Sequence, residues 1–156
     1  MKTVILMICF ALLAACSSSS SGTNAPATGQ KTDYSVCEGG QPPANIEGTW
    51  TRSGNDNGID LTSTIAISKR NLTFTMTCSK DGLTASPTGT SASHYTQDSL
   101  VVENSISVSK TITLKDGTSL SCDLDFQPMT ISYKFKGSCL VLKAPGEDEI
   151  ILVPAR

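Results

Sequence analysis

The chain of 156 residues contains six cysteines and one histidine, and the thiols are its strongest candidates for chemistry. A catalytic site needs a base, a nucleophile and a group that orients them. His94 stands alone in a serine-rich stretch that we expect to be a loop, and no G-x-S-x-G sequence presents a serine nucleophile. Asp123 and Asp125 lie two residues apart in a predicted strand and alternate with apolar residues. We therefore expect both carboxylates to lie on the face of the strand that contacts solvent. These residues do not predict an enzyme.

The sequence also gives no sign of a metal, a cofactor or a nucleic-acid partner. It has no C-x-x-C pair, and His94 has no cysteine near it along the chain, so we expect no zinc site. It has no G-x-x-x-x-G-K sequence to hold a nucleotide phosphate. The formal net charge is −2, and no basic patch is available for nucleic acid.

A short apolar run at the start of the chain ends at Cys16. Lys2 is the only charged side chain before it, and Leu13-Ala14-Ala15-Cys16 closes the run. A membrane-spanning helix needs about 20 apolar residues, so we expect residues 1–15 to be a removable export signal. The thiol of Cys16 is a nucleophile that can carry a diacylglyceryl group.

The Leu-Ala-Ala-Cys sequence resembles the lipobox of bacterial lipoproteins. The resemblance implies S-diacylglycerol and an N-linked acyl chain such as palmitate on Cys16, which together hold a protein stably on a membrane. Ser17 stands where this family has Asp in proteins retained at the inner membrane. We therefore expect attachment to the outer membrane, facing the periplasm or the cell surface. The alternative is an ordinary secretory signal followed by an unrelated cysteine.

The composition divides the rest of the chain into a tether and a domain. Residues 16–45 are rich in Ser, Gly and Pro and have few large apolar groups, so we expect a flexible tether. From residue 46 to residue 156, apolar and polar residues alternate with the period of a half-buried strand. Asn57-Gly58, Asp81-Gly82 and Asp116-Gly117 mark tight turns between these runs. We predict an all-β domain, a small antiparallel barrel of about eight to ten short strands.

Four cysteines lie beyond Cys16, and four cysteines permit three pairings in an exported domain. Cys78 and Cys122 each fall among the apolar, inward-facing residues of an alternating run, so their side chains can meet through the interior. Cys139 falls on the outward-facing side of its predicted strand, where Cys37 of the tether can reach it. We predict disulfides Cys78–Cys122 and Cys37–Cys139. The first closes a loop of about 45 residues, worth about 4 kcal/mol in the chain-entropy model.

The first and last predicted strands resemble those of lipocalin-like domains. The first contains Gly48-Thr49-Trp50, a G-x-W sequence, and the chain ends in Arg156. The resemblance implies that Arg156 lies over the indole of Trp50 and closes the floor of the barrel, a cation–π contact. The alternative is an immunoglobulin-like sandwich, suggested by the order Cys37, Trp50, Cys78. That fold expects Tyr two residues before its second Cys, and this chain has Met76 there.

Lys110 breaks the alternation, because it lies on the apolar parity between Val108 and Ile112. On a continuous strand its ammonium would point inward, where it could contact the carboxylate of an apolar acid. A bulge or a strand break at residues 109–111 would turn it outward instead, and we favour this second interpretation.

Two functions stay open for the domain. The first is a structural or protein-interaction role, in which the barrel is filled by its own side chains and its outer face contacts another envelope protein. The second is the carriage of a small apolar ligand. That role requires a cavity of about 300 Å³ or more, with candidate lining residues Phe74, Met76, Leu124 and Ile131.

Overall fold

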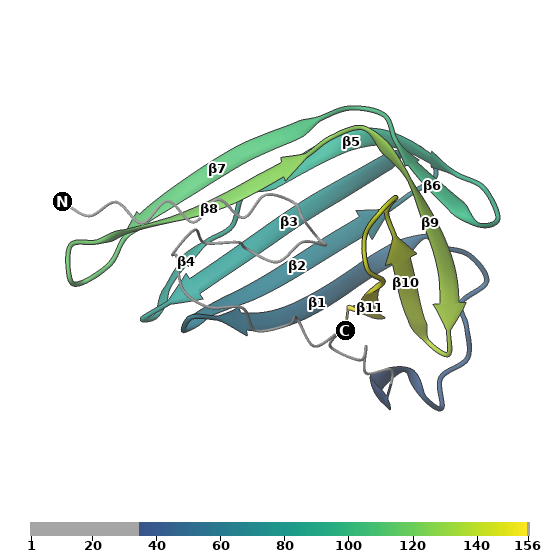
Figure 1. Cartoon of the computed structure of the whole chain (residues 1–156), viewed down its shortest axis with the longest axis horizontal. Helices are drawn as coiled ribbons and strands as arrows, with labels where there is room; N and C mark the ends of the chain where they lie inside the picture. The colour runs from purple at the N-terminus through teal and green to yellow at the C-terminus, as the bar shows by residue number, and fades with distance from the viewer. Residues whose placement is uncertain (1–34, 156) are drawn as a thin grey trace, which may run out of the picture.

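The computed structural model describes residues 35–155, and these fold into an all-β structure (Figure 1). In chain order, the elements are the short 3-10 turn η1 (Ser35–Cys37) and the strands β1 (Gly48–Asp56), β2 (Ile59–Ile67), β3 (Asn71–Lys80), β4 (Leu83–Ala85), β5 (Thr88–Tyr95), β6 (Ser99–Val102), β7 (Ile106–Thr113), β8 (Ser119–Phe126), β9 (Met129–Lys136), β10 (Cys139–Lys143) and β11 (Ile150–Pro154).

Eight strands close into an antiparallel barrel of the small lipocalin-like kind. They follow the order β1-β2-β3-β5-β6-β9-β10-β11, and β11 returns to β1 through Trp50↔Pro154 and Thr51↔Val153. The short strand β4 pairs with the end of β3. Because one continuous sheet closes on itself, the immunoglobulin-like sandwich is excluded.

Tight turns hold the registers of the long strands. Asn57-Gly58 joins β1 to β2, Asp81-Gly82 joins β3 to β4, and all four residues have positive φ. Two-residue turns with positive φ match the twist of antiparallel strands, and Asn-Gly and Asp-Gly tolerate that conformation. The prediction of hairpins at both positions is confirmed.

Strands β7 and β8 form a hairpin that does not join the barrel. They make a separate two-stranded sheet, and β7 lies against β4 and β5 while β8 lies against β3. Figure 1 shows the hairpin running along the long strands toward one end of the molecule, with β9 and β10 near the other end. The hairpin therefore adds a second layer over part of the sheet.

The core lies inside the barrel and between the long strands and this hairpin. The inward residues predicted from the alternation are buried in one cluster, for example Ile65, Leu72, Leu124 and Ile131. The rings of Phe74 on β3 and Phe126 on β8 lie 5.0 Å apart between centroids. Core packing thus joins the hairpin to the barrel strands.

Both predicted disulfides are present. Cys78 on β3 bonds to Cys122 on β8, across the core and over a sequence separation of 44 residues. Cys37 bonds to Cys139 at the start of β10, with 5.3 Å between their Cα atoms. Composition placed residues 35–45 in the tether, yet η1 lies against the β9–β10 turn. Gly137 has no room for a Cβ atom there, because the Cys37 carbonyl occupies that space.

The structure corrects two expectations. His94 lies in β5 and not in a loop. The bulge proposed around Lys110 is absent from β7, whose pairing with β8 is unbroken from Ile106↔Phe126 to Thr113↔Ser119. Lys110 is nevertheless exposed.

Two buried serines on the inner face of β5 differ in their hydrogen bonding. The Ser91 hydroxyl accepts a hydrogen bond from the Asn104 N–H at 2.9 Å and lies 3.0 Å from the Asn104 carbonyl oxygen. The Ser93 side chain is 3% exposed, and its hydroxyl has no hydrogen-bond partner within residues 35–155. Ser91 therefore fixes the chain just before β7, whereas Ser93 leaves a polar group unsatisfied.

We predict opposite results for alanine at these two positions. Ser91→Ala leaves backbone groups of Asn104 without a partner and should lower the free energy of unfolding by about 1–3 kcal/mol. Ser93→Ala removes a buried unsatisfied hydroxyl and should leave stability unchanged or raise it. Urea denaturation of the oxidised proteins measures both values. Equal destabilisation by the two variants would contradict the different hydrogen bonding of Ser91 and Ser93.

Candidate functional site

One end of the barrel is closed by the residues that lead into β1. Ile46 is fully buried, and Trp50 is 3% exposed. The Trp50 indole Nε1–H donates to the Ile46 carbonyl oxygen at 2.9 Å, and its ring lies 6.0 Å from the ring of Phe135 on β9. The indole hydrogen bond satisfies the one polar group that Trp50 carries into the core. Ile46 and Trp50 thus occupy this end.

Two tyrosines add polar contacts across the same end. The Tyr95 hydroxyl on β5 donates to Glu47 Oε1 at 2.8 Å, and the Tyr133 hydroxyl on β9 donates to the Thr96 carbonyl oxygen at 2.7 Å. The hydrogen bond to Glu47, then burial, raises the pKa of Tyr95 above its ordinary value of 10.0. Burial, then the charge of Asp98, raises the pKa of Tyr133. Both hydroxyls are therefore neutral donors at physiological pH.

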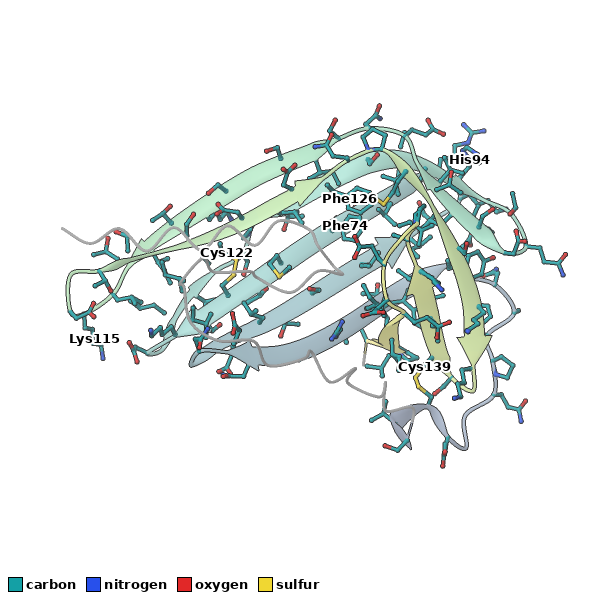
Figure 2. The ribbon with its side chains drawn as sticks, viewed as in Figure 1. Phe74, His94, Lys115, Cys122, Phe126 and Cys139 are labelled. Carbon is teal, nitrogen blue, oxygen red and sulfur yellow. A yellow bond between two sulfur atoms is a disulfide. The ribbon has the colours of Figure 1, made fainter. Side chains whose placement is uncertain are left out.

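The hairpin covers the inner face of β3 beyond this end. Figure 2 shows Phe74 and Phe126 close together between the two layers, with Cys122 further along the hairpin toward Lys115 at its tip. The four candidate lining residues, Phe74, Met76, Leu124 and Ile131, are between 1% and 6% exposed and belong to the same core cluster. They pack against the chain's own side chains.

The acidic candidates lie on the outward face of the hairpin. Asp123 accepts hydrogen bonds from the hydroxyls of Ser109 and Ser121, the latter at 2.8 Å. Asp125 is exposed and accepts from Gln127 Nε2 at 3.2 Å. These contacts solvate and order the hairpin surface, as the alternation predicted. Lys110, the possible ligand contact, is exposed on β7 and does not reach the barrel interior.

His94 lies on the outer surface, in an ion-pair geometry with a carboxylate. Its Nδ1 is 2.8 Å from Glu103 Oε1, and both side chains are about half exposed, at 57% and 47%. In Figure 2, His94 and Lys115 lie near opposite ends of the molecule. Within residues 35–155, no three His, Cys, Asp or Glu side chains are grouped so as to hold a metal ion.

The outer face of β1 to β5 is a wall of paired hydroxyl groups. Neighbouring strands, and Ser86 between β4 and β5, contribute paired side chains with oxygen–oxygen distances of 3.0 to 3.1 Å: Ser53–Thr62, Thr73–Thr90, Thr75–Thr88, Thr77–Ser86 and Ser79–Thr84. We call these ten residues the hydroxyl wall. The alternation of β3 identified its wet face, but pairing with β4 and β5 was needed to find the wall.

Two predicted sites fall outside the described residues. Cys16, the lipid attachment site, and Arg156, the partner proposed for Trp50, both lie beyond residues 35–155. Lipid attachment and closure of the floor by Arg156 therefore stay predictions. Among residues 35–155, no helix has the length and hydropathy needed to cross a bilayer.

Comparison with known proteins gives no relative: no family model, no curated protein and no solved structure matches the chain. The fold defines it as an antiparallel β-barrel protein with two disulfides.

We predict that Tyr95 makes the stability of the protein sensitive to alkaline pH. Because folding raises its pKa, the stabilisation is complete below pH 10 and is lost as the pH rises through the folded-state value. Tyr95→Phe should be less stable than wild type at neutral pH and should lose less stability above pH 10. Urea denaturation between neutral and alkaline pH measures this difference, with Tyr133→Phe as the matched variant that keeps the Glu47 bond. Equal alkaline slopes for wild type and Tyr95→Phe would contradict the assignment.

Proposed function

We propose that this chain is a bacterial envelope lipoprotein whose barrel is not an enzyme and has a structural or protein-interaction role. S-diacylglycerol and an N-linked acyl chain on Cys16 anchor it, in the outer membrane, with the barrel in the periplasm or at the surface. The lipobox-like Leu13-Ala14-Ala15-Cys16 and the following Ser17 support the anchor and its location.

The packing of the interior is the observation that carries the proposed role. The candidate lining residues belong to a single core cluster, and the Cys78–Cys122 disulfide crosses it. Ile46 and Trp50 occupy one end, and the hairpin covers the inner face of β3. Since these inner surfaces contact one another, the outer faces are what the barrel offers to a partner.

The hydroxyl wall is the outer face best suited to contact another envelope protein. Its ten side chains carry no charge, so a partner that covers them does not have to desolvate an ion except at the edge, where Asp60 pairs with Ser79. Threonine is β-branched and stiff, and paired hydroxyls such as Thr75 and Thr88 are already ordered. Ordered side chains lose little conformational entropy on association.

The alternative function is lipocalin-like carriage of a small apolar ligand, and one observation favours it. The Ser93 hydroxyl is buried on the inner face of β5 without a partner. A ligand carrying a carboxylate or carbonyl oxygen could accept a hydrogen bond from it. This function would require the core around Ser93 to rearrange.

The anchor is tested on protein expressed from the full sequence in a diderm bacterium. We expect mass spectrometry to find a mature chain beginning at an acylated Cys16, in the membrane fraction. Cys16→Ser should prevent acylation, because serine has no thiol for thioether formation. Recovery of wild type as a soluble protein with an unmodified Cys16 would contradict the anchor.

The interaction role is tested by crosslinking in intact envelopes. We expect a reproducible crosslinked species that Thr75→Lys, in the hydroxyl wall, abolishes. The matched control Ser107→Lys, exposed on β7, should keep it. No crosslinked species, combined with a fatty acid that copurifies with wild type and is lost from Ser93→Ala, would replace this role with ligand carriage.

A further inference from the structure

The β7–β8 hairpin is attached to the rest of the fold by few backbone contacts. No strand of the barrel pairs with β7 or β8, so their backbone ladders are only with each other. Just before β7, the Glu103 N–H donates to the Ala92 carbonyl oxygen, and the Asn104 N–H donates to the Ser91 hydroxyl. The hairpin is thus hinged at its start and otherwise docked through side chains.

Three side-chain contacts dock it on the strands beneath. Ile106 lies on Gly89, where a Cβ atom would overlap its methyl group. Phe126 lies on Phe74 with 5.0 Å between ring centroids. Cys122, midway along β8 and opposite Lys110, is bonded to Cys78. The covalent bond is therefore placed between the hinge and the tip.

We propose that Ile106–Phe126 is a flap, a unit that opens separately from the barrel and that the Cys78–Cys122 disulfide holds closed over β3. Without this disulfide the flap undocks while the eight-stranded barrel stays closed. Closure of the barrel does not use β7 or β8, since β6 pairs directly with β9. A two-stranded hairpin released from its packing surface is marginally stable in water, so the released flap loses its protection as a unit.

Undocking exposes an apolar surface that the closed state hides. The inner face of β3 under the flap presents Phe74 and Met76, which are 2% and 6% exposed in the closed state. The flap side contributes Leu120, Leu124 and Phe126. Opening of the flap does not depend on the proposed envelope role.

Hydrogen exchange of the purified full-length protein tests the flap. In Cys78→Ala/Cys122→Ala, amide exchange in residues 106–126 should accelerate at least about tenfold more than in β1, β2 and β9. Binding of a hydrophobic fluorescent dye should rise with it. The matched control Cys37→Ala/Cys139→Ala keeps the flap disulfide, so residues 106–126 should exchange no faster than its barrel strands. Equal acceleration of all strands in the first variant would overturn the proposal, and so would full protection of the flap.

A second variant keeps the test decisive if the double-cysteine variant does not fold. Gly89→Ala, with both disulfides intact, forces Ile106 away and should increase exchange near the hinge more than near Cys122. Gly89→Ala/Ile106→Ala restores the space and should bring exchange near the hinge back toward that of Ile106→Ala alone. If Gly89→Ala instead increases exchange equally near Cys122 and in the barrel strands, the flap is not a separate unit and the proposal fails.

Discussion

Contact between β3 and β8 is the constraint on which the rest of the structure depends. The Phe74–Phe126 ring contact and the Cys78–Cys122 bond join a barrel strand to a hairpin that has no backbone pairing with the barrel. In a domain of this size a cross-link over 44 residues is worth about 4 kcal/mol in the chain-entropy model, a large share of typical net stability. The second disulfide has a different place, since it fastens η1 to the outer side of β10.

This arrangement connects the fold to the proposed role. Core side chains fill the space between β3 and the hairpin, Ile46 and Trp50 close one end, and the Tyr95–Glu47 bond crosses that end. Ten hydroxyl side chains on the outer face of β1 to β5 pair with one another in the hydroxyl wall. In the proposed role, the hydroxyl wall is the ordered outer surface offered to a partner, and the inner surfaces serve stability.

The alternation of residues predicted the strands because each strand of a barrel has one buried face. The same parity argument predicted Cys78–Cys122, since both side chains point inward. Parity within a strand carries no information about its neighbours, however. It therefore could not show that β7 and β8 leave the barrel, that Lys110 is exposed on an unbroken strand, or that Thr75 meets Thr88. The hydrogen bond from the Asn104 N–H to the Ser91 hydroxyl also depends on the folded path of the chain.

The central claim is that the chain's own side chains occupy the interior between β3 and β8. Solution NMR of the oxidised protein tests it most directly, through nuclear Overhauser contacts between the ring protons of Phe74 and Phe126. The account predicts that these contacts are present and do not change when a fatty acid is added. Their loss on addition of the fatty acid, with new contacts from the acyl chain to both rings, would contradict it.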